Sequence, residues 1–366
     1  MSEERILFLS PCVPRAGGNG LAMRAHAVSE ALRELGSVEI FVRPVWRVSM
    51  WIGTHVPWLW QLGGPAARDW PSMTRWLPVS GEFSRVHVFR MAMVPWAVGF
   101  VGQVACDLDL DESEVQARRR IAGLYRAKAA HLHAWTIDRE AAFYEARERE
   151  WLPRFRRVYA SSTIEMKRLQ SQYSALPLRL LPNTVSLAAP NVRARSGKFR
   201  VLFVGTLDHY PNADAADFLV AAIAPLLDPN HFEICIAGGG GGRQARLRRM
   251  LSPGRTVRWM GFVKDLEGLY AATDAVVVPI RAGGGTRIKI LEALAHGLPV
   301  VSTAVGMEGL DLEPNRELLL AETAVEFASA CELLRTNMEL ARSLGDSGRN
   351  VVSRSYCKAV LTAALA

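Results

Sequence analysis

The sequence predicts an α/β protein built from two doubly wound parallel sheets. In both halves, short apolar runs of strand length alternate with segments whose apolar residues recur at helical spacing. Glycine-rich loops follow several of these runs, which is typical of sheets that bind ligands beyond the carboxyl ends of their strands. A chain of 366 residues is also long enough for two domains.

The first half opens with a strand, a glycine loop, a helix and a second strand. The strand covers residues 6–10, the loop is Gly17-Gly18-Asn19-Gly20, the helix covers 21–35 and the second strand 38–42. This is not a dinucleotide-binding fingerprint, because the third glycine is missing and no acidic residue ends the second strand. The opening therefore predicts a doubly wound sheet without indicating a dinucleotide.

Residues 44–100 differ from the rest of the chain, since seven of the ten tryptophans and six prolines lie there. The prolines break up any long element. One interpretation is an adaptable binding surface for an apolar acceptor, or a membrane patch with tryptophan at the level of the lipid headgroups. The other is an irregular insertion whose tryptophans are buried.

The first half continues with a strand over 103–108, helices within 114–151, a strand over 158–161 and a short helix capped by Ser162 or Thr163. The first of these strands runs into an acidic segment with Asp107, Asp109 and Asp111. These carboxylates either serve the chemistry or cap a loop and orient a neighbouring helix. Residues 188–198 lack an apolar period and are the best linker candidate.

The second half repeats the design of the first without a repeat at the level of residues. Strands are predicted over 200–204, 232–237, 257–260, 275–279, 300–303 and 318–321, and helices over 214–227, 266–272 and 326–344. The last of these helices has the length of a terminal helix.

The most informative segment of the second half, residues 281–293, follows the predicted strand 275–279. It contains Gly283, Gly284, Gly285, Thr286, Arg287, Lys289 and Glu292. The glycines let backbone N–H groups approach a ligand, and Thr286 is expected to cap a helix whose N-terminus attracts an anion. The two cations add charge there, and the carboxylate one turn further can accept hydrogen bonds from sugar hydroxyls. The segment therefore indicates a nucleoside diphosphate with its ribose nearby; the alternative is a tight turn with a purely structural role.

The net charge and the sequence patterns limit the classes of partner that we expect. The net charge of +8 suits an anionic ligand or an anionic membrane surface, although a solvated basic surface without a partner remains an alternative. No zinc-finger, RNP-like or basic-tail pattern indicates nucleic acid. His131 and His133 lack a third ligand, so no metal site is expected.

The same considerations give an expected location. Five scattered cysteines without a CxxC pair indicate a reduced, intracellular protein. The first residues do not make a signal peptide, and no apolar run is long enough to span a bilayer. We expect a cytoplasmic protein, with peripheral contact to the inner face of the membrane through residues 44–100 as a further expectation.

The segment from Gly283 to Leu310 resembles the donor-binding segment of GT-B glycosyltransferases, in particular the retaining glycosyltransferase family 4, also called group 1. Four other segments are similar to parts of the same family, namely 107–113, 181–183, 202–216 and 261–265. The resemblance covers residues 100–366 well, covers 1–42 loosely and fades over 44–100. It implies an acceptor domain over 1–186, a donor domain over 199–345, a segment 346–366 that packs back on the first domain, and a ligand cleft between the domains.

The resemblance also implies roles for single residues. Glu292 matches the family glutamate associated with ribose hydroxyls, whereas Gly284 stands where a second glutamate usually faces the transferred sugar. Backbone N–H groups of 283–286 would substitute for that glutamate. Asp109 stands at the position of a family histidine and is a candidate catalytic residue. The remaining candidates on the donor are Thr206, Gly261 and Val263, with Gly17, Gly18 and Asn19 approaching the diphosphate from the other domain.

Arg287 and Lys289 are candidates for the diphosphate on physical grounds, since the family's own basic pair is missing. The resemblance implies a hexosyltransferase-like enzyme that transfers a sugar from a nucleoside-diphosphate donor with retention, without a metal or cofactor. The acceptor is expected to be a glycan, a lipid-linked molecule or an apolar small molecule. Two alternatives stay open: a nucleotide-sugar epimerase or hydrolase of the same fold, and a non-catalytic nucleotide-sugar-binding scaffold.

Overall fold

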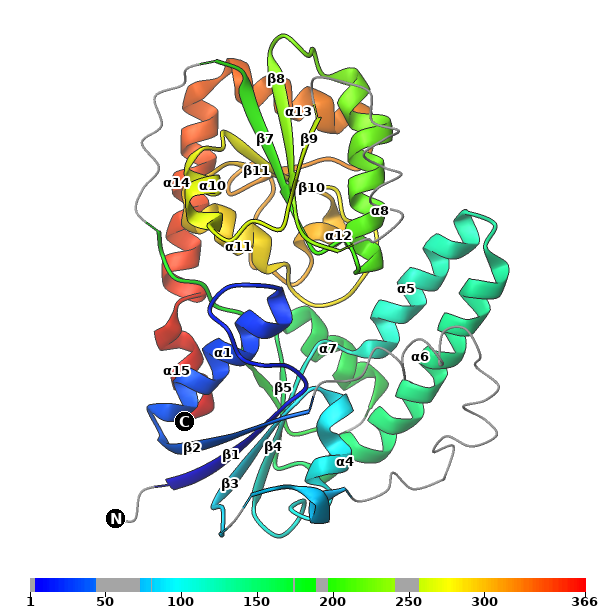
Figure 1. Ribbon diagram of the computed structural model, residues 1–366, viewed down its shortest axis with the longest axis vertical. Coiled ribbons are helices and arrows are strands. Elements are labelled where there is room, and N and C mark those ends of the chain that lie inside the picture. Colours follow the sequence, from blue (N-terminus) through cyan, green and yellow to red (C-terminus); the bar gives the residue numbers. More distant parts are fainter. Residues whose placement is uncertain (1–3, 44–72, 80, 174, 189–196, 241–256) are drawn as a thin grey trace. The chain divides into compact units, whose positions relative to one another are not determined.

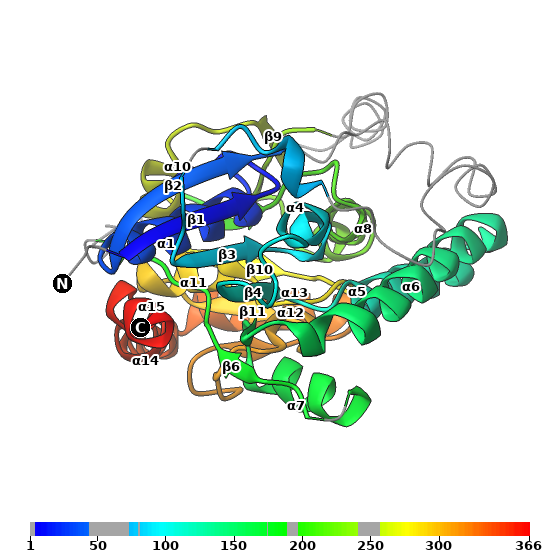
Figure 2. The same ribbon diagram turned by 90° about the horizontal axis from the view of Figure 1, so that it is seen from below.

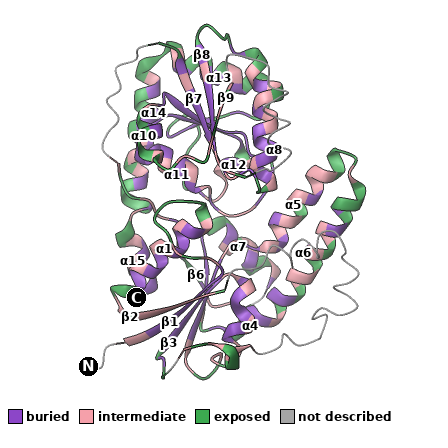
Figure 3. Ribbon diagram, viewed as in Figure 1, coloured by how far each residue is buried: buried purple, intermediate pink, exposed green. Residues whose placement is uncertain are grey.

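The computed structural model describes residues 4–43, 73–79, 81–173, 175–188, 197–240 and 257–366. The chain divides into two compact units. Unit 1 comprises Met1–Asn183 and Lys358–Ala366, and unit 2 comprises Thr184–Cys357. Each unit contains a parallel sheet with helices on its faces (Figure 1). The central strands of both sheets are almost fully buried, as parallel sheets covered by helices require, whereas edge strands are partly exposed (Figure 3).

Unit 1 has a sheet of six described strands in the order β2-β1-β3-β4-β5-β6. The strands are β1 Glu4–Ser10, β2 Gly36–Val42, β3 Arg85–Phe89, β4 Ala105–Asp111, β5 Arg157–Ala160 and β6 Leu178–Leu180. All neighbours pair in parallel. The chain runs from β1 outward to β2 and then returns to β3 on the other side of β1, so the switch point of unit 1 lies between β1 and β3.

Six described α-helices surround this sheet. They are α1 Gly20–Arg33, α4 Val94–Ala97, α5 Glu114–Ala127, α6 His131–Trp151, α7 Thr163–Gln172 and α15 Lys358–Leu365. The last of them comes from the far end of the chain and packs on α1. Thr362 Oγ1 donates a hydrogen bond to Glu34 Oε2 (2.9 Å), and Lys358 Nζ lies 2.6 Å from Glu34 Oε1.

Unit 2 has a second sheet of six described strands in the order β12-β11-β10-β7-β8-β9, also parallel throughout. The strands are β7 Phe199–Val204, β8 Phe232–Ala237, β9 Val257–Gly261, β10 Ala275–Val278, β11 Val300–Ser302 and β12 Leu319–Leu320. The described helices are α8 Tyr210–Phe218, α10 Leu266–Ala271, α11 Ile288–Ala295, α12 Ala304–Met307, α13 Ala324–Thr336 and α14 Met338–Ser355. The switch point of this unit lies between β7 and β10.

The predicted doubly wound architecture is confirmed in both units, and four details differ. The region 44–100 contains a buried strand, β3, although we predicted no strand there. The predicted helix 326–344 is two helices, because the Asn337 side chain accepts the Leu340 N–H (3.0 Å) and starts a new one. The predicted helix 214–227 begins earlier, at Tyr210, and its α-helical part ends at Phe218. The segment 346–366 divides, since α14 belongs to unit 2 and only residues from Lys358 join unit 1.

The tryptophan-rich region is only partly described, because residues 44–72 lie outside the described residues. Of the two tryptophans described there, Trp96 is buried against Phe41 and Trp76 is exposed. The residues that the structure describes therefore include one example of each interpretation.

Candidate functional site

The switch point of unit 2 gathers most of the predicted donor residues. Thr206 lies in the turn that follows β7, and the glycine loop 283–285 follows β10, its neighbour in the sheet. The helix that carries Lys289 and Glu292, α11, begins where this loop ends. Loops beyond the carboxyl ends of strands at a switch point are the usual ligand site of such sheets.

Lys289 is tied to the turn after β7. Its Nζ donates a hydrogen bond to Asn212 Oδ1 (2.8 Å) and lies 4.7 Å from the centre of the Phe203 ring. Asn212 in turn donates to the Thr206 carbonyl (3.0 Å). Burial, with a smaller contribution from the charge of Arg287, lowers the pKa of Lys289 to about 7. The lysine is therefore held in place by neutral partners, and an anion beside it would restore its full charge.

Glu292 lies one turn after Lys289 on the same face of α11. It accepts a hydrogen bond from the Tyr270 hydroxyl (3.2 Å), and burial raises its pKa to about 7. The Tyr270 ring stacks on His296, with ring centroids 4.8 Å apart. A carboxyl group whose protein partner is a neutral hydroxyl is suited to accept hydrogen bonds from the hydroxyls of a ligand.

The glycine loop closes around Arg287. The Nη1 of this arginine donates to the carbonyls of Gly284 and Gly285, with 3.0 Å to the latter. Gly283 and Gly285 have φ of 114° and 66°, in the left-handed region that favours glycine. The prediction that Thr286 caps the helix is wrong, because the helix starts at Ile288 with Arg287 at the N-cap position. Arg287 thus shapes the loop as well as adding charge to it.

Arg281 has a role in this region that the sequence did not reveal. It forms two hydrogen bonds with Asp214 on α8, 2.9 Å and 3.0 Å long, and its guanidinium lies 4.7 Å from the centre of the Phe218 ring. These contacts fix the start of the glycine loop against α8. The available signal was a cation directly after a strand, which does not by itself identify a partner.

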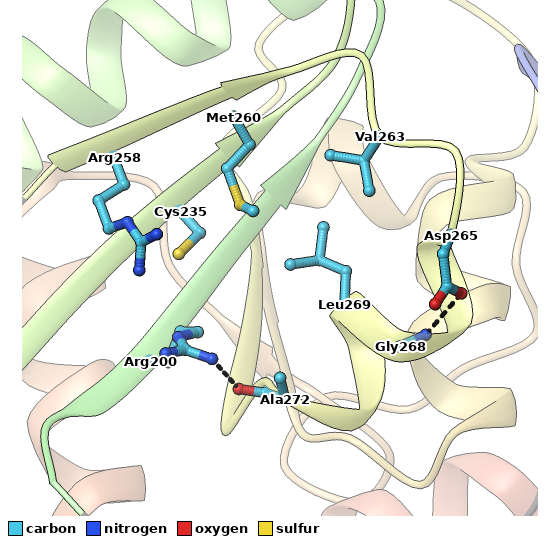
Figure 4. Close-up of a pocket in the computed structure, with 9 residues that line it drawn as sticks. All are labelled: Arg200, Cys235, Arg258, Met260, Val263, Asp265, Gly268, Leu269 and Ala272. Atoms are coloured by element: carbon cyan, nitrogen blue, oxygen red, sulfur yellow. Dashed lines mark hydrogen bonds between the residues drawn. The ribbon is translucent and has the colours of Figure 1, made fainter.

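Gly261 and Val263 come from the end of β9 and the segment that follows it, two strands away from β7 in the same sheet. Gly261 ends β9, and its carbonyl accepts a hydrogen bond from the Gly238 N–H (2.8 Å). Val263 lines a hollow of about 290 Å³ between α10 and the strands β7, β8 and β9 (Figure 4). None of the residues that line this hollow belongs to 281–292. Its two arginines, Arg200 and Arg258, share the carboxylate of Glu233 (2.7 Å and 2.9 Å), which offsets one of their two positive charges.

The glycine loop of unit 1 follows β1 at the switch point of its sheet. Asn19 accepts the Ala22 N–H (2.9 Å) and caps α1. A Cβ atom added at Gly17 or Gly18 would have no heavy atom within 4 Å, so this part of the loop borders open space. The structure thus gives Asn19 a capping role and leaves the two glycines open.

Asp109 is fully buried at the carboxyl edge of the unit 1 sheet. Its carboxylate forms a bidentate pair with Arg24 of α1, 2.7 Å and 3.0 Å long, and Arg24 also donates to Asn183 Oδ1 (3.1 Å). Burial raises the pKa of Asp109, and the adjacent guanidinium opposes that rise. The catalytic role of Asp109 stays a prediction, and in this structure both oxygens of its carboxylate are bound by Arg24. The sequence signal for its partner was an arginine amid the apolar positions of the predicted helix 21–35.

The neighbouring acidic residues are paired in the same way. Asp107 contacts Arg85 and Arg156 (3.0 Å and 2.6 Å), and Asp111 contacts Arg90 (3.3 Å). These pairs favour the second interpretation of the acidic segment, in which the carboxylates orient neighbouring elements.

In the part of the chain that the structure describes, no group of three or more His, Cys, Asp or Glu side chains is arranged to hold a metal ion. No helix among the described residues is long and apolar enough to cross a membrane.

Comparison with known proteins bears on the same unit. Residues 198–337 match the family model described as glycosyl transferases group 1. Unit 2 therefore carries a group 1 glycosyltransferase domain. A curated relative, an uncharacterized 44.6 kDa protein in the cps region of Klebsiella pneumoniae, is 27% identical over 135 residues. That match spans 35% of each chain, about a third of the length of the relative.

Solved glycosyltransferase structures resemble the whole chain. Sucrose-phosphate synthase from Thermosynechococcus elongatus is 18% identical, with a TM-score of 0.71 over 99% of this chain and 97% of that one. HepE from Anabaena, in complex with UDP and glucose, is 15% identical, with a TM-score of 0.68 over 98% and 97%. A glycosyltransferase from Rickettsia africae is 13% identical, with a TM-score of 0.65 over 99% and 97%. At these identities the likeness shows the fold, which is the predicted GT-B fold, and with the group 1 domain it supports a glycosyltransferase enzyme.

Proposed function

We propose that this protein transfers a sugar from a nucleoside-diphosphate donor to an acceptor hydroxyl, with the donor bound at the switch point of unit 2. The observation that carries the proposal is the environment of Lys289. Its ammonium is held by Asn212 and Phe203 at the carboxyl end of β7, next to the glycine loop that follows β10. The group 1 domain covers these residues, and HepE, which has the same fold, has been crystallised with UDP and glucose.

The chemistry follows from where charge develops. When the bond between the sugar and the diphosphate breaks, negative charge builds on the leaving oxygen. Lys289 and the backbone N–H groups of 283–286 would stabilise that charge more in the transition state than before it. Glu292 would accept the ribose hydroxyls, and Tyr270 would orient its carboxylate. Arg287 would act by fixing the conformation of the glycine loop, through its hydrogen bonds to the loop carbonyls.

We further propose that transfer proceeds with retention and without a metal ion. The acceptor oxygen forms its bond to the anomeric carbon on the face from which the diphosphate leaves, and the acceptor proton passes to the departing diphosphate oxygen. This route needs no carboxylate nucleophile, in keeping with the burial of Asp109 against Arg24. The acceptor is a glycan, a lipid-linked molecule or an apolar small molecule.

The test begins with calorimetric titration of UDP, GDP and ADP, followed by incubation of the matching nucleotide sugar with a panel of acceptors. We expect one base to bind best, transfer to an acceptor, and donor that persists when no acceptor is present. Rapid turnover of the donor alone would favour an epimerase or hydrolase. Binding without transfer to any acceptor would favour a scaffold protein. If no nucleotide bound, both the proposed transferase and the scaffold alternative would be contradicted.

A further inference from the structure

The helical hairpin α5–α6 is an arm of unit 1. It begins directly after β4, and in both views it extends beyond the rest of unit 1, with its turn at the far end (Figures 1 and 2). Ion pairs hold the two helices together along their length. They join Arg118 to Glu140 (3.0 Å), Arg119 to Glu145 (2.8 Å) and Arg126 to Asp138 (2.6 Å). The hairpin is therefore a braced element that presents its turn away from the sheet.

The start of α6, next to the turn of the hairpin, presents two large apolar side chains to solvent. Leu132 is 72% exposed and Trp135 is 50% exposed, and their spacing puts them on the same face of α6. The guanidinium of Arg139, one turn further, lies 5.8 Å from the centre of the Trp135 ring. Single exposed apolar residues are ordinary, but two adjacent ones at the end of a projecting arm form a small apolar tip.

The outer part of the hairpin, which includes this tip, is basic. Between residues 119 and 139 the chain has five Arg or Lys residues, which are Arg119, Arg120, Arg126, Lys128 and Arg139, against one acidic residue, Asp138. The segment thus carries half of the net charge of +8 of the whole chain.

We propose that the hairpin tip, residues 126–139, docks on a membrane surface rich in anionic phospholipid. Tryptophan next to aliphatic side chains, ringed by Arg and Lys, is the composition of elements that lie at the lipid headgroups. Each cation near an anionic leaflet strengthens binding, and the apolar pair enters the interface between headgroups and acyl chains. The tip belongs to unit 1 and shares no residue with the proposed donor site in unit 2, so the inference does not depend on the proposed function.

The site differs from the one that the sequence indicated, and the chain offers a matched control. The expected membrane contact was in 44–100, where Trp76 is 65% exposed with Arg75 5.2 Å from the centre of its ring. Trp76 and Trp135 are thus both exposed tryptophans with an arginine over the ring. They differ in that Trp135 has an exposed leucine beside it on the same helical face and lies in the basic hairpin.

The experiment is sedimentation of the full chain with vesicles of phosphatidylcholine, with and without phosphatidylglycerol. We expect binding only to the anionic vesicles, and its loss in high salt because the charges are screened. The double variant Leu132→Ser/Trp135→Ser should bind about tenfold more weakly. The variant Lys128→Gln/Arg139→Gln should lose roughly 25-fold, about fivefold per cation. Trp76→Ser should bind like the unchanged protein.

Circular dichroism and nucleotide titration establish that each variant is folded. Equal binding of the Leu132→Ser/Trp135→Ser variant and the unchanged protein would overturn the proposal, as would equal binding to neutral vesicles. Loss of binding in Trp76→Ser, with the hairpin variants unaffected, would return the contact to the tryptophan-rich region. If the unchanged protein bound RNA or an acidic protein but no vesicle, the tip would be assigned to that partner instead.

Discussion

The carboxyl edges of the two sheets both carry charged residues, but they neutralise them differently. In unit 1, Asp109 is buried against the guanidinium of Arg24, and its acidic neighbours also face arginines. In unit 2, Lys289 and Glu292 have the neutral hydrogen-bond partners Asn212 and Tyr270, and burial brings both pKa values to about 7. Matched ion pairs hold elements in place, whereas groups close to neutrality at working pH respond to an incoming charge. On this basis we propose a structural role for the first edge and ligand binding for the second.

The largest expected effect tests the structural role of the first edge. Asp109→Asn should lower the free energy of unfolding by about 3–5 kcal/mol, because it removes the bidentate partner of the buried Arg24 and leaves only the longer contact with Asp111 (3.5 Å). Urea denaturation followed by circular dichroism measures this change. Glu313→Gln, which breaks the exposed pair with Arg316, is the matched control and should change little. A mild effect of Asp109→Asn on unfolding with a large loss of transfer would instead make Asp109 catalytic.

Lys289→Met tests the second edge. It should lower the rate of sugar transfer by about 100- to 1000-fold, the usual cost of removing one group that stabilises developing charge. The free energy of unfolding should not fall, since a partly buried ammonium is replaced by an apolar chain of similar size. Lys198→Met is the control, because that lysine is exposed and donates to the Pro229 carbonyl (2.5 Å). Near-normal transfer by the Lys289→Met variant would refute the assignment of the site.

The ribose contact predicts a smaller effect. In the unchanged protein, removal of the ribose 2′-hydroxyl from the bound nucleoside diphosphate should weaken binding by about tenfold. In Glu292→Gln this discrimination should shrink, while the hydrogen bond to Tyr270 has a substitute acceptor. Calorimetric titration of both nucleotides against both proteins forms a double-mutant cycle. Equal discrimination in the two proteins would remove Glu292 from the ribose.

A further comparison, of an effect similar in size to the ribose contact, is between the two glycine loops. Gly283→Ala should cost about 1–2 kcal/mol of stability, because φ is 114° and the new Cβ would lie 3.0 Å from Arg287 Nη2. Gly17→Ala should be within about 0.5 kcal/mol of neutral, since a Cβ there meets no atom within 4 Å. Thermal unfolding distinguishes the two. If both substitutions were neutral, the unit 2 loop would not depend on its backbone conformation.

The sequence predicted the architecture because parallel strands buried on both faces read as apolar runs, and each glycine loop followed such a run. It also predicted Lys289 and Glu292, whose spacing on a helix fixes their common face. It did not predict the partners Arg24 and Arg281, because contacts between distant segments depend on how the elements pack. The break at Asn337 was missed because the apolar period continues through it, and β3 because tryptophans and prolines obscured a five-residue run.

The central claim is that Lys289 meets the diphosphate, and proton uptake on binding tests it most directly. With a pKa of about 7, Lys289 is mostly neutral at pH 8, and the phosphates would raise its pKa and recharge it. Binding should therefore take up close to one proton at pH 8, and affinity should fall by up to about tenfold per pH unit above 7. Calorimetry in buffers of different ionisation enthalpy measures the uptake. Proton uptake should disappear in Lys289→Met. The same uptake in both proteins, or none in either, would contradict a contact between Lys289 and the diphosphate.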